Sequence, residues 1–152
     1  MRTRLHERPR VLFVCTHNAA RSQLAEALLR KYAGDRFEAA SAGFEPTEVH
    51  PLTRTVLAEI GLDGSRLHAK ALRDFLARQA VRHAIIVCAQ AEEQCPKIYP
   101  FSGETLYWAF DDPTAPESSP ELQLAKFRRV RDEIDARIRA WLRTPPSKGL
   151  DR

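Results

Sequence analysis

The apolar run RVLFVC at residues 10–15 is the feature that most restricts how this chain can fold. The run is short and rich in β-branched and aromatic residues, which predicts a buried strand. A pattern with a period near 3.6 follows almost at once and predicts a helix over 20–33, with Leu24, Leu28 and Tyr32 on one face. A buried strand that runs directly into a helix is typical of a parallel sheet covered by helices.

The same alternation of apolar runs and helical patterns continues along the chain. Ser119-Pro120 has the pattern of a helix N-cap and first helical residue. The further strands are predicted at 36–41, 82–88 and 105–110, and the further helices at 51–60, 70–79 and 120–142. We therefore predict the α/β class, with a single catalytic domain over 9–143, a parallel sheet with helices on both faces, and flexible tails at 1–8 and 144–152.

Composition narrows the class of protein. The chain has 152 residues, 43% of them hydrophobic and 29% charged, and no apolar run approaches the roughly 18 residues of a membrane span. The basic start lacks the apolar segment of a signal peptide, and three cysteines are an odd number, so we expect a cytoplasmic protein without a disulfide framework. The net charge of +4 suits an anionic substrate, but its clustering near the N-terminus and in the last helix does not predict nucleic-acid binding.

Three of the predicted strands deliver a reactive side chain to one edge of the sheet. Cys15 ends the first strand, Cys88 ends another, and Asp111 and Asp112 follow a third. In an open parallel sheet the ligand binds in the crevice beyond the carboxyl ends of the strands. This convergence makes the edge the candidate site, and it carries more weight than any single residue.

The loop after Cys15 has the composition of an oxyanion site. Small residues allow a tight curl, Asn18 tolerates a left-handed backbone, and amide groups at a helix N-terminus bind anions of phosphate size. Arg21 can donate two hydrogen bonds to the anion, and its charge and the Ser22 hydroxyl stabilise the Cys15 thiolate as a nucleophile. A buried cysteine followed by a solvated arginine is the weaker alternative. The predicted substrate-binding residues are Thr16, His17, Asn18, Ala19, Ala20, Arg21 and Ser22.

Cys88 and Cys95 need a separate explanation, because such a loop requires only its own cysteine, its arginine and an acid. They could be small buried residues, zinc ligands or a redox pair, but they form no close C-x-x-C pair and the nearby histidines show no ligand spacing. If 89–95 is helical, their seven-residue separation spans about 10.5 Å along the axis. A disulfide needs α-carbons about 4.4–6.8 Å apart, so oxidation would have to unwind the polar AQAEEQ segment. We interpret the pair as a candidate redox switch.

Five segments resemble one known family, in order and over nearly the whole chain. They are CTHNAARSQLAEALL from residue 15, SAGFEP at 41–46, VCAQAEEQCP at 87–96, YWAFDDP at 107–113 and FRRVRDEI at 127–134. Together these segments resemble the low-molecular-weight tyrosine phosphatase superfamily and, within it, the thioredoxin-coupled arsenate reductases. The resemblance implies a four-stranded parallel sheet flanked by helices.

The resemblance also implies a mechanism without a cofactor. Cys15 would attack arsenate while Asp112, preferred over Asp111 by the superfamily's DP pattern, protonates the leaving oxygen. Cys88 would attack the Cys15–arsenic adduct and release arsenite, and Cys95 would then attack Cys88 and free Cys15. Thioredoxin would reduce the resulting Cys88–Cys95 disulfide.

The chain departs from its relatives at several positions. Ala20 stands where some relatives have a second cysteine in the loop. Gln23 stands where the phosphatases often have proline, and Thr114 and Ala115 stand where they usually have tyrosines, so these positions favour the reductase.

Some family members bind a potassium ion beside the loop. Their ligands match Asn18, Glu26 and Ser41, with a further ligand region near 68–70. Lys70 in that region could supply the positive charge itself, so no metal is predicted.

Two other functions remain open at this point. A low-molecular-weight phosphatase would use Cys15, Arg21 and Asp112 alone and hydrolyse a phosphocysteine intermediate. A non-enzymatic oxyanion or redox sensor would bind without turnover, and the plausible acid argues against it. Nothing in the sequence demands a dimer or a membrane partner, and a monomer is expected.

Overall fold

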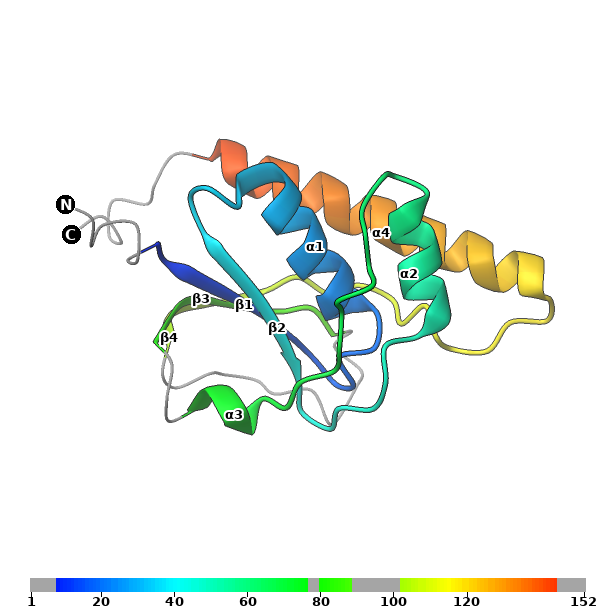
Figure 1. The fold of residues 1–152 in the computed structure, drawn as a ribbon, viewed down its shortest axis with the longest axis horizontal. Coiled ribbons are helices and arrows are strands. Elements are labelled where there is room, and N and C mark those ends of the chain that lie inside the picture. The colour runs from blue at the N-terminus through cyan, green and yellow to red at the C-terminus, as the bar shows by residue number, and fades with distance from the viewer. Residues whose placement is uncertain (1–7, 77–79, 89–101, 145–152) are drawn as a thin grey trace.

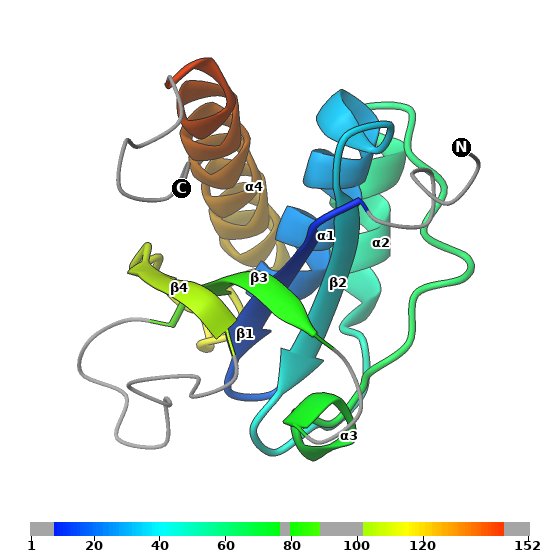
Figure 2. The same ribbon diagram turned by 90° about the vertical axis from the view of Figure 1, so that its left-hand side faces the viewer.

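Four parallel strands form one sheet in the computed structural model, which describes residues 8–76, 80–88 and 102–144. The strands are β1 (Arg10–Cys15), β2 (Glu38–Gly43), β3 (Val81–Ile86) and β4 (Ser102–Tyr107). Their order is β2-β1-β3-β4, so β1 lies in the interior of the sheet with a parallel neighbour on each side (Figures 1 and 2). All four strands therefore point their carboxyl ends toward one edge.

Helices cover the sheet unequally. The helices are α1 (Arg21–Ala33), α2 (Pro51–Ala58), α3 (Arg73–Leu76) and α4 (Pro120–Arg143). The first, second and fourth lie together on one side of the sheet, and the single-turn α3 lies on the other side, beyond β2 (Figures 1 and 2). The expected α/β fold with a four-stranded parallel sheet is confirmed.

The core lies between the sheet and the pair α1 and α4. Residues 11–13 of β1 are fully buried, as is the apolar face of α1 with Leu24 and Leu28. The apolar face of α4 is buried as its spacing predicted, and its residues are Phe127, Val130, Ile134 and Ile138. Burial of this apolar surface stabilises the fold that holds the loop after β1 in place.

Tyr32 is more exposed than Leu24 and Leu28, with which its spacing groups it on α1. Its side chain is 37% exposed, and its hydroxyl donates to the carboxylate of Asp135 on α4. A tyrosine at the end of a helix can bury its ring edge and keep its polar group in water. Tyr32 thus differs from Leu24 and Leu28, which are fully buried.

Some element bounds differ from the sequence prediction. β2 begins at Glu38 rather than residue 36, because the amides of Arg36 and Phe37 donate to the Ala33 carbonyl and complete the turn after α1. β4 covers 102–107 rather than 105–110. The predicted helix over 70–79 is present only as α3, and 77–79 lie outside the described residues.

Candidate active site

Cys15 ends β1 with its side chain buried, and the chain then curls through five residues into α1. Asn18 has a φ of 55°, which is the left-handed conformation that the sequence suggested for this residue. Gly43, at the end of β2, lies directly against the loop. A Cβ added there would come within 2.8 Å of the Asn18 amide nitrogen and the His17 carbonyl carbon. The loop therefore takes its shape against a position that requires glycine.

The loop carbonyls all turn outward. The carbonyl oxygens of Cys15, Thr16, His17 and Ala19 accept hydrogen bonds from the amides of Phe44, Glu45, Thr47 and His50. The carbonyl of Asn18 accepts from Gln23 Nε2, and that of Ala20 accepts from the Leu24 amide. Because a peptide N–H points opposite to the carbonyl of the same peptide unit, the loop amides face inward. No side chain caps the N-terminus of α1, which leaves an anion-binding nest.

The Cys15 sulfur lies at the floor of this nest. It accepts a hydrogen bond from the Asn18 amide at 3.2 Å and lies 2.8 Å from Ser22 Oγ. Ser22 Oγ also accepts from Asn18 Nδ2 at 2.7 Å, so its own proton can be directed at the sulfur. Two donors aimed at one sulfur stabilise the thiolate form of Cys15.

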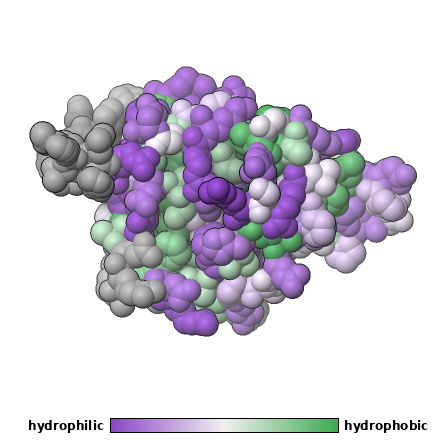
Figure 3. Space-filling model, in the orientation of Figure 1, coloured by the Kyte–Doolittle hydropathy of each residue, from purple (hydrophilic) through white to green (hydrophobic). Residues whose placement is uncertain are grey.

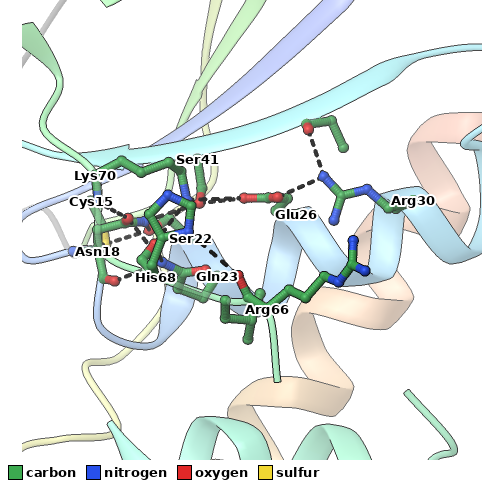
Figure 4. A network of polar contacts seen from close by, with 12 residues as sticks. Cys15, Asn18, Ser22, Gln23, Glu26, Arg30, Ser41, Arg66, His68 and Lys70 are labelled. Carbon is green, nitrogen blue, oxygen red and sulfur yellow. Dashed lines mark hydrogen bonds and ion pairs between the residues drawn. The ribbon is translucent and has the colours of Figure 1, made fainter. Parts of the chain in front are cut away.

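The Asn18 side chain is fixed by partners on both sides, as Figure 4 shows. Its Oδ1 accepts from the Lys70 amide at 2.8 Å and from Gln23 Nε2 at 2.9 Å. With the oxygen assigned in this way, Nδ2 donates to Ser22 and to Ser41 Oγ, the latter at 3.1 Å. The network holds the residue that in turn donates to the Cys15 sulfur.

Glu26 ends this chain of contacts. Its Oε1 accepts from Ser41 Oγ at 2.6 Å and lies 3.6 Å from Lys70 Nζ, and its Oε2 accepts from Arg30 at 2.6 Å. Burial lowers the pKa of Lys70, and the charge of Glu26 opposes that shift. Lys70 therefore brings its own ammonium to the carboxylate of Glu26.

Arg21 lies at the mouth of the nest with its side chain only 4% exposed. Its Nη1 donates to the Phe110 carbonyl at 3.1 Å, and its Nη2 lies 3.8 Å from Asp112 Oδ2. The segment after β4 thus positions the arginine as well as the candidate acid.

The two aspartates after β4 have different surroundings. Asp112 Oδ1 accepts from the amide and the hydroxyl of Thr114, at 3.0 and 2.7 Å. Asp112 also lines a cavity of about 210 Å³ together with Cys15 and the loop. Asp111 pairs instead with Arg129 of α4 at 3.2 Å and is 70% exposed. The geometry therefore favours Asp112 as the residue that faces a bound oxyanion.

The cavity also contains residues that sequence reasoning did not select. They are Thr47, Glu48, His50 and Thr114. His50 Nδ1 accepts from the Leu52 amide at 3.0 Å and caps α2, and its ring packs 4.8 Å from that of Phe127. Burial lowers the pKa of His50 and so favours the neutral imidazole, and the charge of Asp112 opposes this shift. The only sequence signal for the capping role of His50 is its position directly before Pro51 at a predicted helix start.

Cys88 lies next to the loop because β3 pairs with β1. The Val87 amide donates to the Val14 carbonyl at 2.9 Å, and Thr16 Oγ1 donates to Cys88 Sγ at 3.9 Å. Cys88 is buried and disulfide-bonded, whereas Cys15 is a free thiol. Cys95 and the polar segment 89–95, which the redox interpretation involves, lie outside the described residues.

The described part of the chain has neither a membrane-spanning helix nor a metal-binding cluster. None of its helices has the length and apolar character needed to cross a membrane. Residues 8–76, 80–88 and 102–144 also contain no cluster of three or more His, Cys, Asp or Glu side chains suited to a metal ion.

The chain matches known proteins over most of its length. The model of the family described as low molecular weight phosphotyrosine protein phosphatase matches residues 10–151. An arsenate reductase of Halalkalibacterium halodurans is 38% identical over 134 residues, which cover 88% of this chain and 95% of that protein.

Solved structures agree with this match. An arsenate reductase in a phosphate binding state superposes with a TM-score of 0.72 at 26% identity, covering 88% of this chain and 96% of that one. The thioredoxin-dependent arsenate reductase of Corynebacterium glutamicum gives a TM-score of 0.63 at 34% identity. That match covers 94% of this chain and 62% of the other.

Proposed function

The chain belongs to the low molecular weight phosphotyrosine protein phosphatase family, and from this premise we propose that it is an arsenate reductase that works with three cysteines and thioredoxin. The observation that carries the proposal is the position of Cys88. Its sulfur lies 3.9 Å from the hydroxyl of Thr16, the first residue of the oxyanion loop. A phosphatase needs one cysteine at this edge of the sheet, whereas a reductase needs a second thiol that can reach the first.

Substrate binding uses the loop and Arg21. The inward amides of 16–21 hold the oxygens of arsenate, and the helix N-terminus favours its negative charge. Arg21 is held by the Phe110 carbonyl, so it donates to the anion without first having to be ordered.

The first chemical step forms a bond between the Cys15 sulfur and arsenic. The Cys15 thiolate attacks As(V), and one oxygen leaves arsenic as water after Asp112 supplies a proton. Thr114 donates two hydrogen bonds to one oxygen of Asp112, which leaves the other oxygen to carry the proton.

The second step reduces arsenic. The Cys88 thiolate attacks the Cys15 sulfur, the sulfur–arsenic bond breaks, and its electron pair stays on arsenic, which leaves as As(III) in arsenite. Two thiols have then been oxidised to a Cys15–Cys88 disulfide. The parallel pairing of β1 and β3, which brings the two strand ends together, supports this step.

The last steps restore Cys15. Cys95 attacks Cys88, frees the Cys15 thiol and leaves a disulfide between Cys88 and Cys95, which thioredoxin reduces by thiol exchange. A free Cys15 beside a disulfide-bonded Cys88 is the combination that this exchange leaves behind. A reducing compartment such as the cytoplasm suits this cycle, and a monomer suffices for it.

Phosphatase activity is the second candidate function, favoured by the family match itself and by the same nest, Arg21 and Asp112. Arsenate and phosphate are near-isosteric, so both chemistries fit one loop. In the phosphatase reaction water would hydrolyse a Cys15 phosphocysteine, and neither Cys88 nor Cys95 would take part.

An arsenate turnover assay with NADPH, thioredoxin reductase and thioredoxin separates the two functions. We expect sustained NADPH oxidation by the wild type and none beyond the first turnover in Cys88→Ser or Cys95→Ser. Hydrolysis of an aryl phosphate serves as the control, because the loss of either thiol should leave the rate of hydrolysis unchanged. If the wild type consumes no NADPH while all three proteins hydrolyse the ester equally, the reductase proposal is wrong.

A further inference from the structure

A second and larger cavity lies outside the site of Cys15. It has a volume of about 550 Å³ and lies between α1, β2 and the connection over 62–70. Cavities of about 300–1,000 Å³ commonly bind small molecules. We propose that this cavity binds a phosphate monoester, with the phosphate between the guanidinium groups of Arg30 and Arg66 and the organic group against an apolar wall. The proposal does not depend on the arsenate reductase function.

Arg30 presents unused donors to this cavity. Its Nη2 donates both to Glu26 Oε2 at 2.6 Å and to the Ala39 carbonyl at 2.9 Å. Its Nε and Nη1 form no hydrogen bond with any described residue, and its side chain is 54% exposed. The contacts through Nη2 fix the guanidinium, so the remaining N–H groups have a set direction.

Arg66 supplies the second guanidinium. Figure 4 shows its side chain extending along the same region as that of Arg30, and both residues line the cavity. Arg66 is exposed and forms no ion pair within the described part of the chain. Two guanidinium groups that share one cavity repel each other, and a phosphate between them would replace that repulsion with charge-assisted hydrogen bonds.

The charges that line the cavity leave a surplus of two. The cationic lining residues are Arg10, Arg30, Lys31, Arg66 and Lys70, and the acidic ones are Glu26, Glu38 and Asp63. Glu26 is held by Arg30 and Ser41, and Glu38 by Arg10 at 2.9 Å. Asp63 interacts electrostatically with Arg66 but forms no ion pair with it among the described residues, so the guanidinium keeps its donors for a ligand. The surplus matches the double negative charge of a phosphate monoester near neutral pH.

One wall of the cavity is apolar, which distinguishes an ester from a free ion. Leu62 and Leu67 are half-buried, Phe75 is buried, and all three line the cavity. Figure 3, in the orientation of Figure 1, shows hydrophilic side chains gathered in the middle of this face beside a strip of hydrophobic surface. An inorganic phosphate would gain nothing from that wall, whereas an organic group would bury apolar area against it.

Calorimetric titration of the Cys15→Ser chain with phenyl phosphate, at 0.15 M salt, tests the proposal. The serine prevents a phosphocysteine from forming, so binding is measured without turnover. We expect two sites per chain, one lost in Cys15→Ser/Arg21→Gln and the other weakened about tenfold or more in Cys15→Ser/Arg66→Gln. Arg73→Gln is the matched control, because Arg73 is an exposed arginine of α3 outside the cavity and its loss should leave both sites unchanged.

Amide chemical shifts locate each binding event. Binding at the second site should shift the amide resonances near Arg30 and of residues 62–68. The same resonances should not shift in Cys15→Ser/Arg66→Gln. A single site per chain, or a second site that Arg66→Gln leaves intact, would overturn the proposal. Inorganic phosphate in place of phenyl phosphate should bind the second site at least several-fold more weakly, and equal affinity would overturn the assignment to an ester.

Discussion

The guanidinium of Arg21 lies 3.8 Å from the carboxylate of Asp112, and both side chains line the cavity that contains Cys15. Arg21 is almost fully buried, whereas Asp112 is 41% exposed. The separation is longer than a hydrogen bond, so an oxyanion oxygen can take the arginine's donors without breaking a tight ion pair.

Asp112→Asn should lower the rate of the first chemical step by about 10²–10⁴-fold, because the amide cannot supply a proton to the leaving oxygen. This step can be measured directly as the single-turnover formation of the Cys15 adduct from an aryl phosphate. Quenched-flow mass spectrometry is the readout. Asp111→Asn is the matched control, since Asp111 pairs with Arg129 and should change the rate less than about twofold. Equal losses in the two variants would remove Asp112 from its role.

Ser22→Ala should reduce the reactivity of Cys15. The hydroxyl lies 2.8 Å from the sulfur, and one hydrogen bond to a charged group is worth about 1.5–3 kcal/mol. We expect the rate of alkylation by iodoacetamide at pH 6 to fall about tenfold or more. Ser118→Ala changes an exposed serine in the loop before α4 and serves as the control. Unchanged alkylation in Ser22→Ala would mean that the Asn18 amide alone stabilises the thiolate.

Lys70→Gln should destabilise the fold by about 1–2 kcal/mol, because it leaves the buried carboxylate of Glu26 with Arg30 as its single cationic partner among the described residues. Urea unfolding measures the change. Lys31→Gln is the control, because Lys31 is an exposed lysine that lines the same cavity between α1 and β2 as Lys70. It should change the free energy of unfolding by less than about 0.5 kcal/mol. Equal stabilities of Lys70→Gln and the wild type would show that Arg30 and Ser41 satisfy Glu26 without the lysine.

His50 gives the unfolding free energy a dependence on pH. Because burial lowers the pKa of folded His50 from its ordinary 6.5, the unfolded chain takes up a proton first as the pH falls. The contribution is therefore fully present above pH 6.5 and is lost as the pH drops toward the lower folded pKa. His50→Asn keeps an acceptor for the Leu52 amide but does not titrate.

Urea unfolding from pH 7.5 to pH 5 measures this effect. In His50→Asn the loss of stability per pH unit should be smaller, by up to about 1.4 kcal/mol per pH unit for one proton. A parallel slope in His50→Asn would mean that another group is responsible.

The sequence predicted the elements and the site where a local pattern decides them. The apolar run before Cys15, the periodic face of α4 and the Ser119-Pro120 helix start are all local, and the structure has them within a residue or two. The exposure of Tyr32 is not set by a local pattern, because its hydroxyl binds Asp135, 103 residues away. The roles of His50 and of the Asn18–Ser41–Glu26 network also depend on contacts between distant segments, for which helix and strand periodicity gives no signal.

Gly43 gives the most direct test of how the fold shapes the nest. A Cβ there would come within 2.8 Å of two backbone atoms of the loop, so Gly43→Ala must push the loop away from β2. We expect the phosphate affinity measured by calorimetry to fall about tenfold or more, because the inward amides would no longer converge on one anion. Gly61→Ala is the matched control, since Gly61 has a φ of 82° and no atom within 4 Å of an added Cβ. That substitution should cost about 1 kcal/mol of stability through backbone strain and leave phosphate affinity unchanged. Parallel losses of affinity in the two variants would mean that global stability, and not the close approach of β2 to the loop, controls the oxyanion site.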